Sequence, residues 1–220
     1  MSAFAGPGSP DRGSVLRRLK GTVAPADPSR GALTGLASRP SSSLARQLAT
    51  PAMPAAVLVA LLERGAGGLE VVFTQRAEHL KNHPGQVSFP GGRIEPHDRG
   101  PADAALREAQ EEIGLCPRSV EIAGYLDAQL TVSGFAVTPV VGVVHEAAFT
   151  PRPDPTEVAE VFVAPLAFFL DPGNRRCGFR DYQGSRFEVI EYHWEGRRIW
   201  GATASMLVRL VAMLQESGPR

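Results

Sequence analysis

The chain has 220 residues, 43% hydrophobic and 21% charged, which is enough for one globular domain with additional segments. Its 23 basic and 23 acidic residues cancel, so no global positive field favours nucleic acid as a partner. No apolar run approaches the ~20 residues of a membrane span, and two distant cysteines exclude a disulfide scaffold and a cysteine-rich zinc module. With no signal peptide evident at the N-terminus, we expect a protein of the reducing cytoplasm, with no nucleic-acid or membrane partner.

Residues 1–50 differ in composition from the rest of the chain. They carry seven basic and two acidic side chains and are rich in Ser, Gly and Pro. Such a segment buries too little apolar surface to offset the entropy lost on ordering. We expect a basic extension over residues 1–50, partly flexible or loosely docked, in which a short basic helix could form near Ser14–Lys20. A separate domain is expected over residues 51–220.

Apolar, β-branched runs indicate that strands dominate this domain. In chain order, strands are predicted at Ala55–Glu63 and Leu69–Gln75 (a hairpin), Val87–Phe89, Ile122–Leu126, Phe135–His145, Val158–Val163, and Phe187–Trp194 with Arg198–Trp200 (a second hairpin). Helices are predicted at Pro101–Ile113, at Leu166–Leu170 as a short helix or turn, and at Ala202–Glu216. A mixed β-sheet flanked by helices, an α/β (α+β) fold, is therefore the expected architecture.

The helix predicted at Pro101–Ile113 has an unfavourable charge distribution at its C-terminal end. Glu108 and Glu112 lie four residues apart on one flank of the apolar stripe, and like charges at this spacing cost about 0.2–0.5 kcal/mol. Glu111 and Glu112 occupy the last turn, where the helix dipole favours cations. Either the cluster holds a hard divalent cation such as Mg²⁺ or Mn²⁺, which prefers carboxylate oxygen, or it is a solvated charged face. The apolar stripe comprises Ala102, Ala105, Leu106, Ala109 and Ile113.

A paired-glycine turn precedes this helix. The segment from Gly85 to Gly92 reads GQVSFPGG and leads from a strand into Pro90-Gly91-Gly92. Glycine pairs let backbone N–H groups approach a ligand closely, although most such turns are merely turns.

Taken together, Gly92–Leu115 resembles the Nudix box, written GX5EX7REUXEEXGU with U a bulky apolar residue. The matching residues are Arg107, Glu108, Glu111, Glu112, Gly114 and Leu115. Asp98 stands where the box has its first Glu, and eight residues rather than seven separate it from Arg107. The upstream residues FTQRA, Lys81, Gly85 and FPGG are similar to the signature of the coenzyme A pyrophosphatase branch of this family. Where that signature has an arginine, this chain has Lys81.

The resemblance implies a Nudix-type α/β/α sandwich with a mixed central β-sheet. It also implies a hydrolase that splits the diphosphate bond of coenzyme A or acyl-CoA, giving 3′,5′-ADP and (acyl-)4′-phosphopantetheine. Its partner would be a small-molecule nucleotide, and its cofactor Mg²⁺ or Mn²⁺. A hydrolase of another nucleoside diphosphate derivative, such as ADP-ribose, and a non-catalytic nucleotide-binding regulator are the alternatives.

Residue roles follow from the same resemblance together with the helix pattern. Glu108 and Glu112 are the expected metal ligands, and Glu111 is an additional ligand or a base acting through water. Arg107 is expected to hold these carboxylates in position. Substrate contacts are expected from Arg76, Lys81, Gly85, Gly91 and Gly92. The catalytic base could instead lie on a distant loop, as Glu157 or Glu160.

Overall fold

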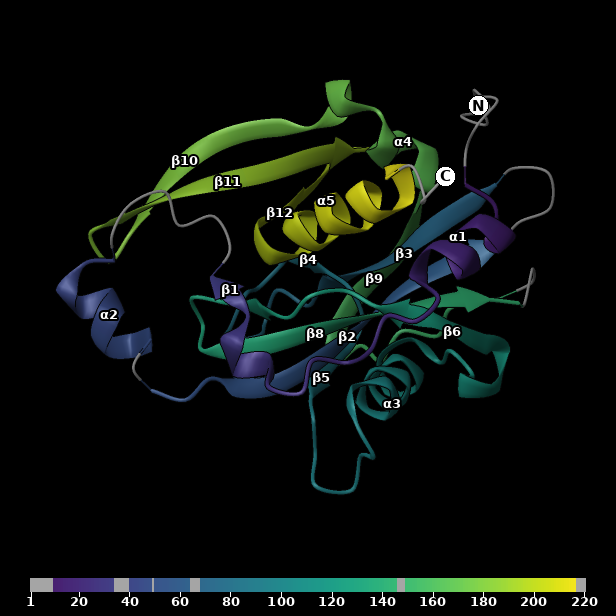
Figure 1. Cartoon of the computed structure of the whole chain (residues 1–220), viewed down its shortest axis with the longest axis horizontal. Helices are drawn as coiled ribbons and strands as arrows, with labels where there is room; N and C mark the ends of the chain where they lie inside the picture. Colours follow the sequence, from purple (N-terminus) through teal and green to yellow (C-terminus); the bar gives the residue numbers. More distant parts are fainter. Residues whose placement is uncertain (1–9, 34–39, 49, 64–67, 146–148, 217–220) are drawn as a thin grey trace.

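The computed structural model describes residues 10–33, 40–48, 50–63, 68–145 and 149–216, and a mixed β-sheet forms its centre (Figure 1). Within these residues the sheet has nine strands, in the order β1-β7-β8-β2-β3-β4, with β5 paired to β2, β6 to β8 and β9 to β3. The bounds are β1 Ala32–Leu33, β2 Met53–Glu63, β3 Leu69–Arg76, β4 Val87–Ser88, β5 Gly91–Arg93, β6 Val120–Tyr125, β7 Gln129–Leu130, β8 Phe135–Val144 and β9 Val158–Pro165. The long strands β2 and β8 are parallel, whereas β3 is antiparallel to both β2 and β9.

A smaller antiparallel sheet follows β9 and contains β10 Arg176–Tyr182, β11 Ser185–Trp194 and β12 Arg197–Trp200. The α-helices are α1 Arg12–Leu19, α2 Ser42–Leu48, α3 Pro101–Ile113, α4 Leu166–Leu170 and α5 Gly201–Gln215. Short 3₁₀ turns lie at Pro28–Arg30, Pro117–Ser119 and Pro172–Asn174. None of the described helices is long and apolar enough to span a membrane.

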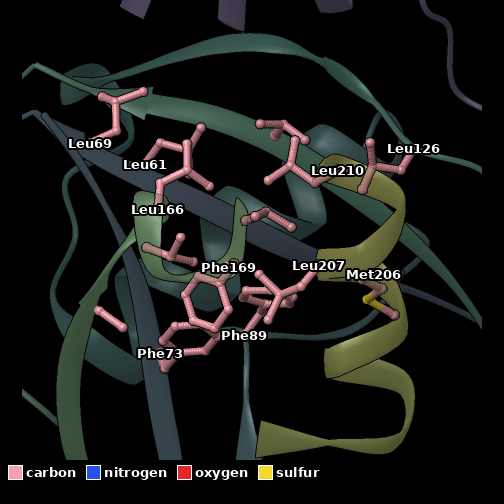
Figure 2. Packing of buried hydrophobic residues seen from close by; sticks show 14 of the residues in the cluster. Leu61, Leu69, Phe73, Phe89, Leu126, Leu166, Phe169, Met206, Leu207 and Leu210 are labelled. Carbon is pink, nitrogen blue, oxygen red and sulfur yellow. The ribbon is translucent and has the colours of Figure 1, made fainter. Parts of the chain in front are cut away.

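Helices cover both faces of the central sheet, and this confirms the expected α/β/α sandwich with a mixed sheet. Side chains of β2 alternate between the two faces: Leu58 and Leu62 join the cluster under α3, whereas Val59 and Leu61 join the larger cluster under α5. Because both faces are buried, β2 is a continuous apolar run. Figure 2 shows the larger cluster, where Phe73 stacks on Phe89 with ring centroids 5.3 Å apart.

Helix α3 has the bounds that the sequence predicts, beginning at Pro101 and ending where the Gly114 N–H bonds to the carbonyls of Ala109 and Gln110. Its buried face differs from the predicted stripe, because Ala104 and Glu112 are buried while Ala102 and Leu106 are only partly so. This face of the helix packs against both β2 and β5.

Several elements were not expected from the sequence: α2, β1, β5, β7 and β10.

Both predicted hairpins are present. The first hairpin is confirmed by pairing of the ends of β2 and β3, although its connection at residues 64–67 lies outside the described residues. The second is confirmed by β11 and β12, whose connecting Glu195 and Gly196 both have positive φ.

Helix α1 is more closely packed than the composition of residues 1–50 suggests. Val15 and Leu19 are fully buried in the α5-side cluster, and Arg12 forms an ion pair with Glu121 of β6. The Thr22 hydroxyl accepts a 2.8 Å hydrogen bond from the Tyr125 N–H. Two apolar side chains one turn apart thus attach this helix to the core. The partial flexibility expected for residues 1–50 stays a prediction. The domain boundary near residue 50 stays a prediction.

Candidate active site

The paired glycines of β5 allow the α3 carboxylates to approach the backbone of the sheet. The Gly91 N–H donates a hydrogen bond to Glu112 Oε2 at 3.2 Å. A Cβ atom at Gly91 would lie 2.3 Å from the Ala56 carbonyl oxygen, and one at Gly92 would lie 2.6 Å from the Glu108 carboxyl group. Gly91 is thus sterically required for the contact of β5 with β2, and a side chain at Gly92 would displace the Glu108 carboxyl group. Their assignment as substrate contacts stays a prediction.

Glu108 and Glu112 are carboxylates held in a poorly solvated place. The Glu112 side chain is buried, with the residue only 6% exposed. Burial raises the pKa of Glu112 to about 8; the nearby Glu108 and Glu157 add to this rise, and the Gly91 N–H and Arg76 oppose it. Burial also raises the pKa of Glu108, against the opposing effect of Arg107. Two neighbouring carboxylates with raised pKa values form a site that a cation would stabilise.

Arg107 connects the residues around this carboxylate pair. Its guanidinium donates to both Asp98 oxygens at 3.1 Å, to Glu108 Oε1 at 2.9 Å and to Glu111 Oε2 at 3.0 Å. It also donates to the Arg93 carbonyl oxygen at 3.1 Å. The Asp98 side chain is 3% exposed, and its hydrogen bonds with Arg107 hold the pKa of Asp98 below its ordinary value. Asp98 therefore serves as the buried anchor of Arg107 despite the altered spacing of the box.

Glu111 lies on the outer side of α3. Its side chain is 59% exposed and pairs with Arg107, one helical turn away. Among the described residues, no three His, Cys, Asp or Glu side chains are arranged to enclose a metal ion. The structure thus brings Glu108 and Glu112 together, and it leaves the role of Glu111 as ligand or base a prediction.

The two candidates for a distant base are in different surroundings. Glu157 lies close enough to Glu108 and Glu112 to raise the pKa of both. Glu160 instead accepts a hydrogen bond from Arg197 Nε at 3.1 Å, and this pairing lowers the pKa of Glu160. Of the pair, Glu157 is the one that the fold brings to the site.

Backbone hydrogen bonds fix the loop that carries Glu157. The Asp154 N–H donates to the Glu112 carbonyl oxygen at 2.9 Å, and the Ala77 N–H donates to the Glu157 carbonyl oxygen at 2.9 Å. His79 Nε2 lies 3.1 Å from the Thr156 carbonyl oxygen. The loop is thereby attached both to the end of α3 and to the segment after β3.

Arg76, at the end of β3, is the predicted anion contact that the structure places nearest to the carboxylates. It lowers the pKa of Glu112 by its charge, and its Nε is buried with no hydrogen-bond partner among the described residues. Lys81 is exposed on the following loop. Gly85 has a φ of +64°, and its N–H bonds to the Arg76 carbonyl oxygen at 3.2 Å, so its evident role is in the turn.

The donor set fits a hard divalent cation. Mg²⁺ is commonly held by one or two carboxylates, with water and substrate phosphate oxygens completing its coordination. Glu108 and Glu112 are two such carboxylates, and their pKa values are raised mainly because burial leaves their charged forms poorly solvated. A structural site enclosed by protein side chains alone would need more ligands than these two.

A carboxylate pair on a helix, set against a glycine turn in an α/β/α sandwich, is typical of proteins that bind phosphate-bearing ligands through a divalent cation. The comparison with protein families gives the particular family: the NUDIX domain matches residues 52–177, and the chain belongs to the Nudix family.

Relatives with similar sequences carry names from this family. Nudix hydrolase 15, mitochondrial, from Arabidopsis thaliana is 38% identical over 170 residues, which are 75% of this chain and 60% of that protein. Nudix hydrolase 22, chloroplastic, from the same plant is 39% identical, and the match covers 56% of its length. The chain thus spans less than two thirds of these plant relatives. The uncharacterized Nudix hydrolase NudL of Salmonella newport is 40% identical over 160 residues, covering 73% of this chain and 82% of that protein.

Among solved structures, the Nudix hydrolase RenU from M. smegmatis is 22% identical, with a TM-score of 0.45. The match covers 53% of this chain and 72% of RenU.

Proposed function

We propose that this protein hydrolyses the diphosphate bond of coenzyme A or acyl-CoA, with Mg²⁺ or Mn²⁺ as cofactor. The products would be 3′,5′-ADP and 4′-phosphopantetheine or its acyl form. The observation that carries the hydrolase proposal is the buried Glu112 beside Glu108, held by the Gly91 N–H and with its pKa raised to about 8. The choice of coenzyme A rests on the sequence motif around Arg76, Lys81 and Gly85.

In the proposed reaction, a water oxygen forms a bond to one phosphorus while that phosphorus loses its bond to the bridging oxygen. The water proton passes to a base, and the bridging oxygen leaves on the other phosphate. Glu108 and Glu112 would hold the divalent ion, which supplies positive charge against the phosphates and acidifies water. Glu157 is the proposed base, and the effect of its charge on the pKa of both Glu108 and Glu112 supports this choice.

The cationic side chains have separate proposed tasks. Arg76 would contact a phosphate through its buried, unpartnered Nε, because a phosphate oxygen satisfies that donor. Lys81 would contribute charge from the loop, without the planar fork of an arginine. Arg107 would keep Glu108 oriented toward the ion through the hydrogen bonds described above.

A substrate panel tests the proposed function. Purified protein is incubated with Mg²⁺ or Mn²⁺ and with coenzyme A, acetyl-CoA, ADP-ribose or a nucleotide sugar, and the products are resolved by chromatography. We expect release of 3′,5′-ADP from the coenzyme A compounds and a higher kcat/KM for them than for the other substrates. Preferential cleavage of ADP-ribose would support the second candidate, which the Lys81 replacement motivates. No turnover of any diphosphate would favour a nucleotide-binding regulator.

The assignment of Glu157 as base gives a separate prediction. Glu157→Gln should lower kcat by about 10²–10⁴-fold, because a glutamine cannot accept the water proton. Glu160→Gln is the matched control: it lies three residues away, pairs with Arg197, and should leave kcat nearly unchanged. Equal effects of the two substitutions would contradict the assignment.

The proposed compartment is the cytoplasm. Both cysteines, Cys116 and Cys177, are free and exposed, as expected where thiols stay reduced. The two plant relatives are named as mitochondrial and chloroplastic proteins. Fractionation of the cells that produce this chain, followed by immunodetection, tests the compartment.

A further inference from the structure

Strand β10 is an exposed sheet edge that no function described above uses. All seven of its residues are exposed, and in the described part of the chain it pairs with β11 on one side only. Figure 1 shows β10 and β11 arching over α5, with β10 on the outer side. Natural edge strands are normally protected by Pro, charged side chains, bulges or covering segments. Strand β10 carries the charged residues Arg176, Arg180 and Asp181, but it contains no Pro and pairs with β11 without a bulge.

Apolar side chains are exposed on this strand. Phe179, at its centre, is 55% exposed, and Tyr182 is 39% exposed. The guanidinium of Arg186, from β11, lies 4.3 Å from the centre of the Phe179 ring, in a cation–π contact. A rigid aromatic side chain on an unpaired edge is well suited to a protein contact.

The connecting turn determines which backbone groups of β10 are unpaired. Gln183 and Gly184 both have positive φ, as in a two-residue type I′ turn, whose flanking pair Tyr182 and Ser185 is hydrogen-bonded. Because hydrogen-bonded pairs alternate along an antiparallel ladder, the even-numbered residues of β10 bond to β11. Cys177, Phe179 and Asp181 therefore direct their N–H and C=O groups outward.

These outward groups are self-complementary. Two copies of β10 placed antiparallel about a two-fold axis at Phe179 align Phe179 with itself and Cys177 with Asp181, so that all three outward residues of each copy are paired. On the other face of the two paired strands, Arg176 then faces Tyr182 of the second copy, and Arg180 faces Gly178 of the second copy. No like charges stand directly opposite each other, and the two Phe179 rings meet at the axis.

We propose that this protein forms a homodimer by antiparallel pairing of β10 with β10 of a second copy. The occupant of the edge is a second copy of this chain, because the hydrogen-bonding register is self-complementary under a two-fold axis and sets no like charges directly opposite each other. Such pairing uses the whole exposed edge and so closes at two copies. At the other side of the small sheet, β12 lies against β4 and leads directly into α5.

The first test measures mass by light scattering and sedimentation from micromolar to millimolar concentration. The full chain should approach twice its 23.4 kDa as the concentration rises. Phe179→Lys places two ammonium groups face to face at the axis and should weaken dimerisation about tenfold or more. Glu188→Gln changes the net charge equally on the neighbouring strand, directly across from Phe179, and should leave the dimer intact. A wild-type chain that stays monomeric throughout, or a dimer insensitive to Phe179→Lys, would overturn the proposal.

A second test reports the register and does not depend on the Phe179 variant folding. In a Cys116→Ser background, Asp181→Cys should form a disulfide with Cys177 of the second copy under mild oxidation, giving a covalent dimer on non-reducing gels. Within one chain these two positions lie four residues apart on an extended strand, too far for a disulfide. Adding Cys177→Ser removes the partner thiol and should abolish the cross-link. Absence of the cross-link, or its persistence without Cys177, would contradict the register.

Discussion

Replacing Glu112 with glutamine is expected to lower kcat by at least about 10²-fold, because it removes one of the two carboxylates proposed to hold the divalent ion. Glutamine has nearly the same shape, and its carbonyl oxygen can still accept the hydrogen bond from the Gly91 N–H. The measurement is a steady-state assay on the best substrate of the panel, together with Mn²⁺ affinity by calorimetry. Near-normal turnover with unchanged affinity would refute the ligand assignment.

The same substitution should stabilise the metal-free protein at alkaline pH. The Glu112 carboxyl has a pKa of about 8 in the folded state against an ordinary value of 4.5, so folding favours its protonated form. In the wild type, the contribution of the Glu112 carboxyl to the free energy of unfolding is fully present below about pH 4.5. It is lost as the pH rises through about 8. Glutamine carries no proton to lose, so Glu112→Gln should raise the Tm above pH 8 by on the order of 10 °C in the presence of a chelator.

The control for this stability effect is Glu111→Gln on the same helix. The Glu111 side chain is 59% exposed, so neutralising it should leave the decrease of Tm with pH as in the wild type. Divalent ions should raise the Tm of the wild type more than that of Glu112→Gln, since only the former retains both carboxylates. If the wild-type Tm did not fall between pH 4.5 and 8, the assigned burial cost of Glu112 would be wrong.

Arg107→Lys should reduce activity about 10–100-fold, because lysine cannot reproduce the planar fork that joins Asp98, Glu108 and the Arg93 carbonyl group. Asp98 would be left with a poorer partner in a buried place, which should cost about 1–3 kcal/mol of unfolding free energy. Denaturant unfolding measures the stability, and the KM and kcat separate binding from orientation of Glu108.

The matched control is Arg99→Lys, because Arg99 also forms an i,i+4 ion pair, as Arg107 does with Glu111. Arg99 is 88% exposed and pairs with Asp103 at the start of α3, where a surface ion pair contributes little. Its replacement should change stability by less than about 0.5 kcal/mol and leave the activity intact. Equal responses to Arg99→Lys and Arg107→Lys would show that Arg107 has no special positioning role.

Local chemistry explains why parts of the fold could be read directly from the sequence. Pro101 and Gly114 delimit α3 because one suits the first helical turn and the other adopts the left-handed conformation that ends a helix. The long apolar runs of β2 and β8 identify buried strands through their composition alone. The short strands β5 and β7 have no such signal, since they exist only because β2 and β8 pair with them.

The sequence by itself determined the α/β fold class, the bounds of α3 and the placement of Glu108 and Glu112 on one flank, because helical periodicity and turn chemistry act over a few neighbouring residues. Only the tertiary structure decided that Glu112 is buried, that Asp98 anchors Arg107, that Glu157 rather than Glu160 reaches the carboxylates, and that α1 packs into the core. Each of these depends on contacts between segments far apart in the chain. Burial and the pKa values that follow from it are properties of such contacts, and no local pattern specifies them.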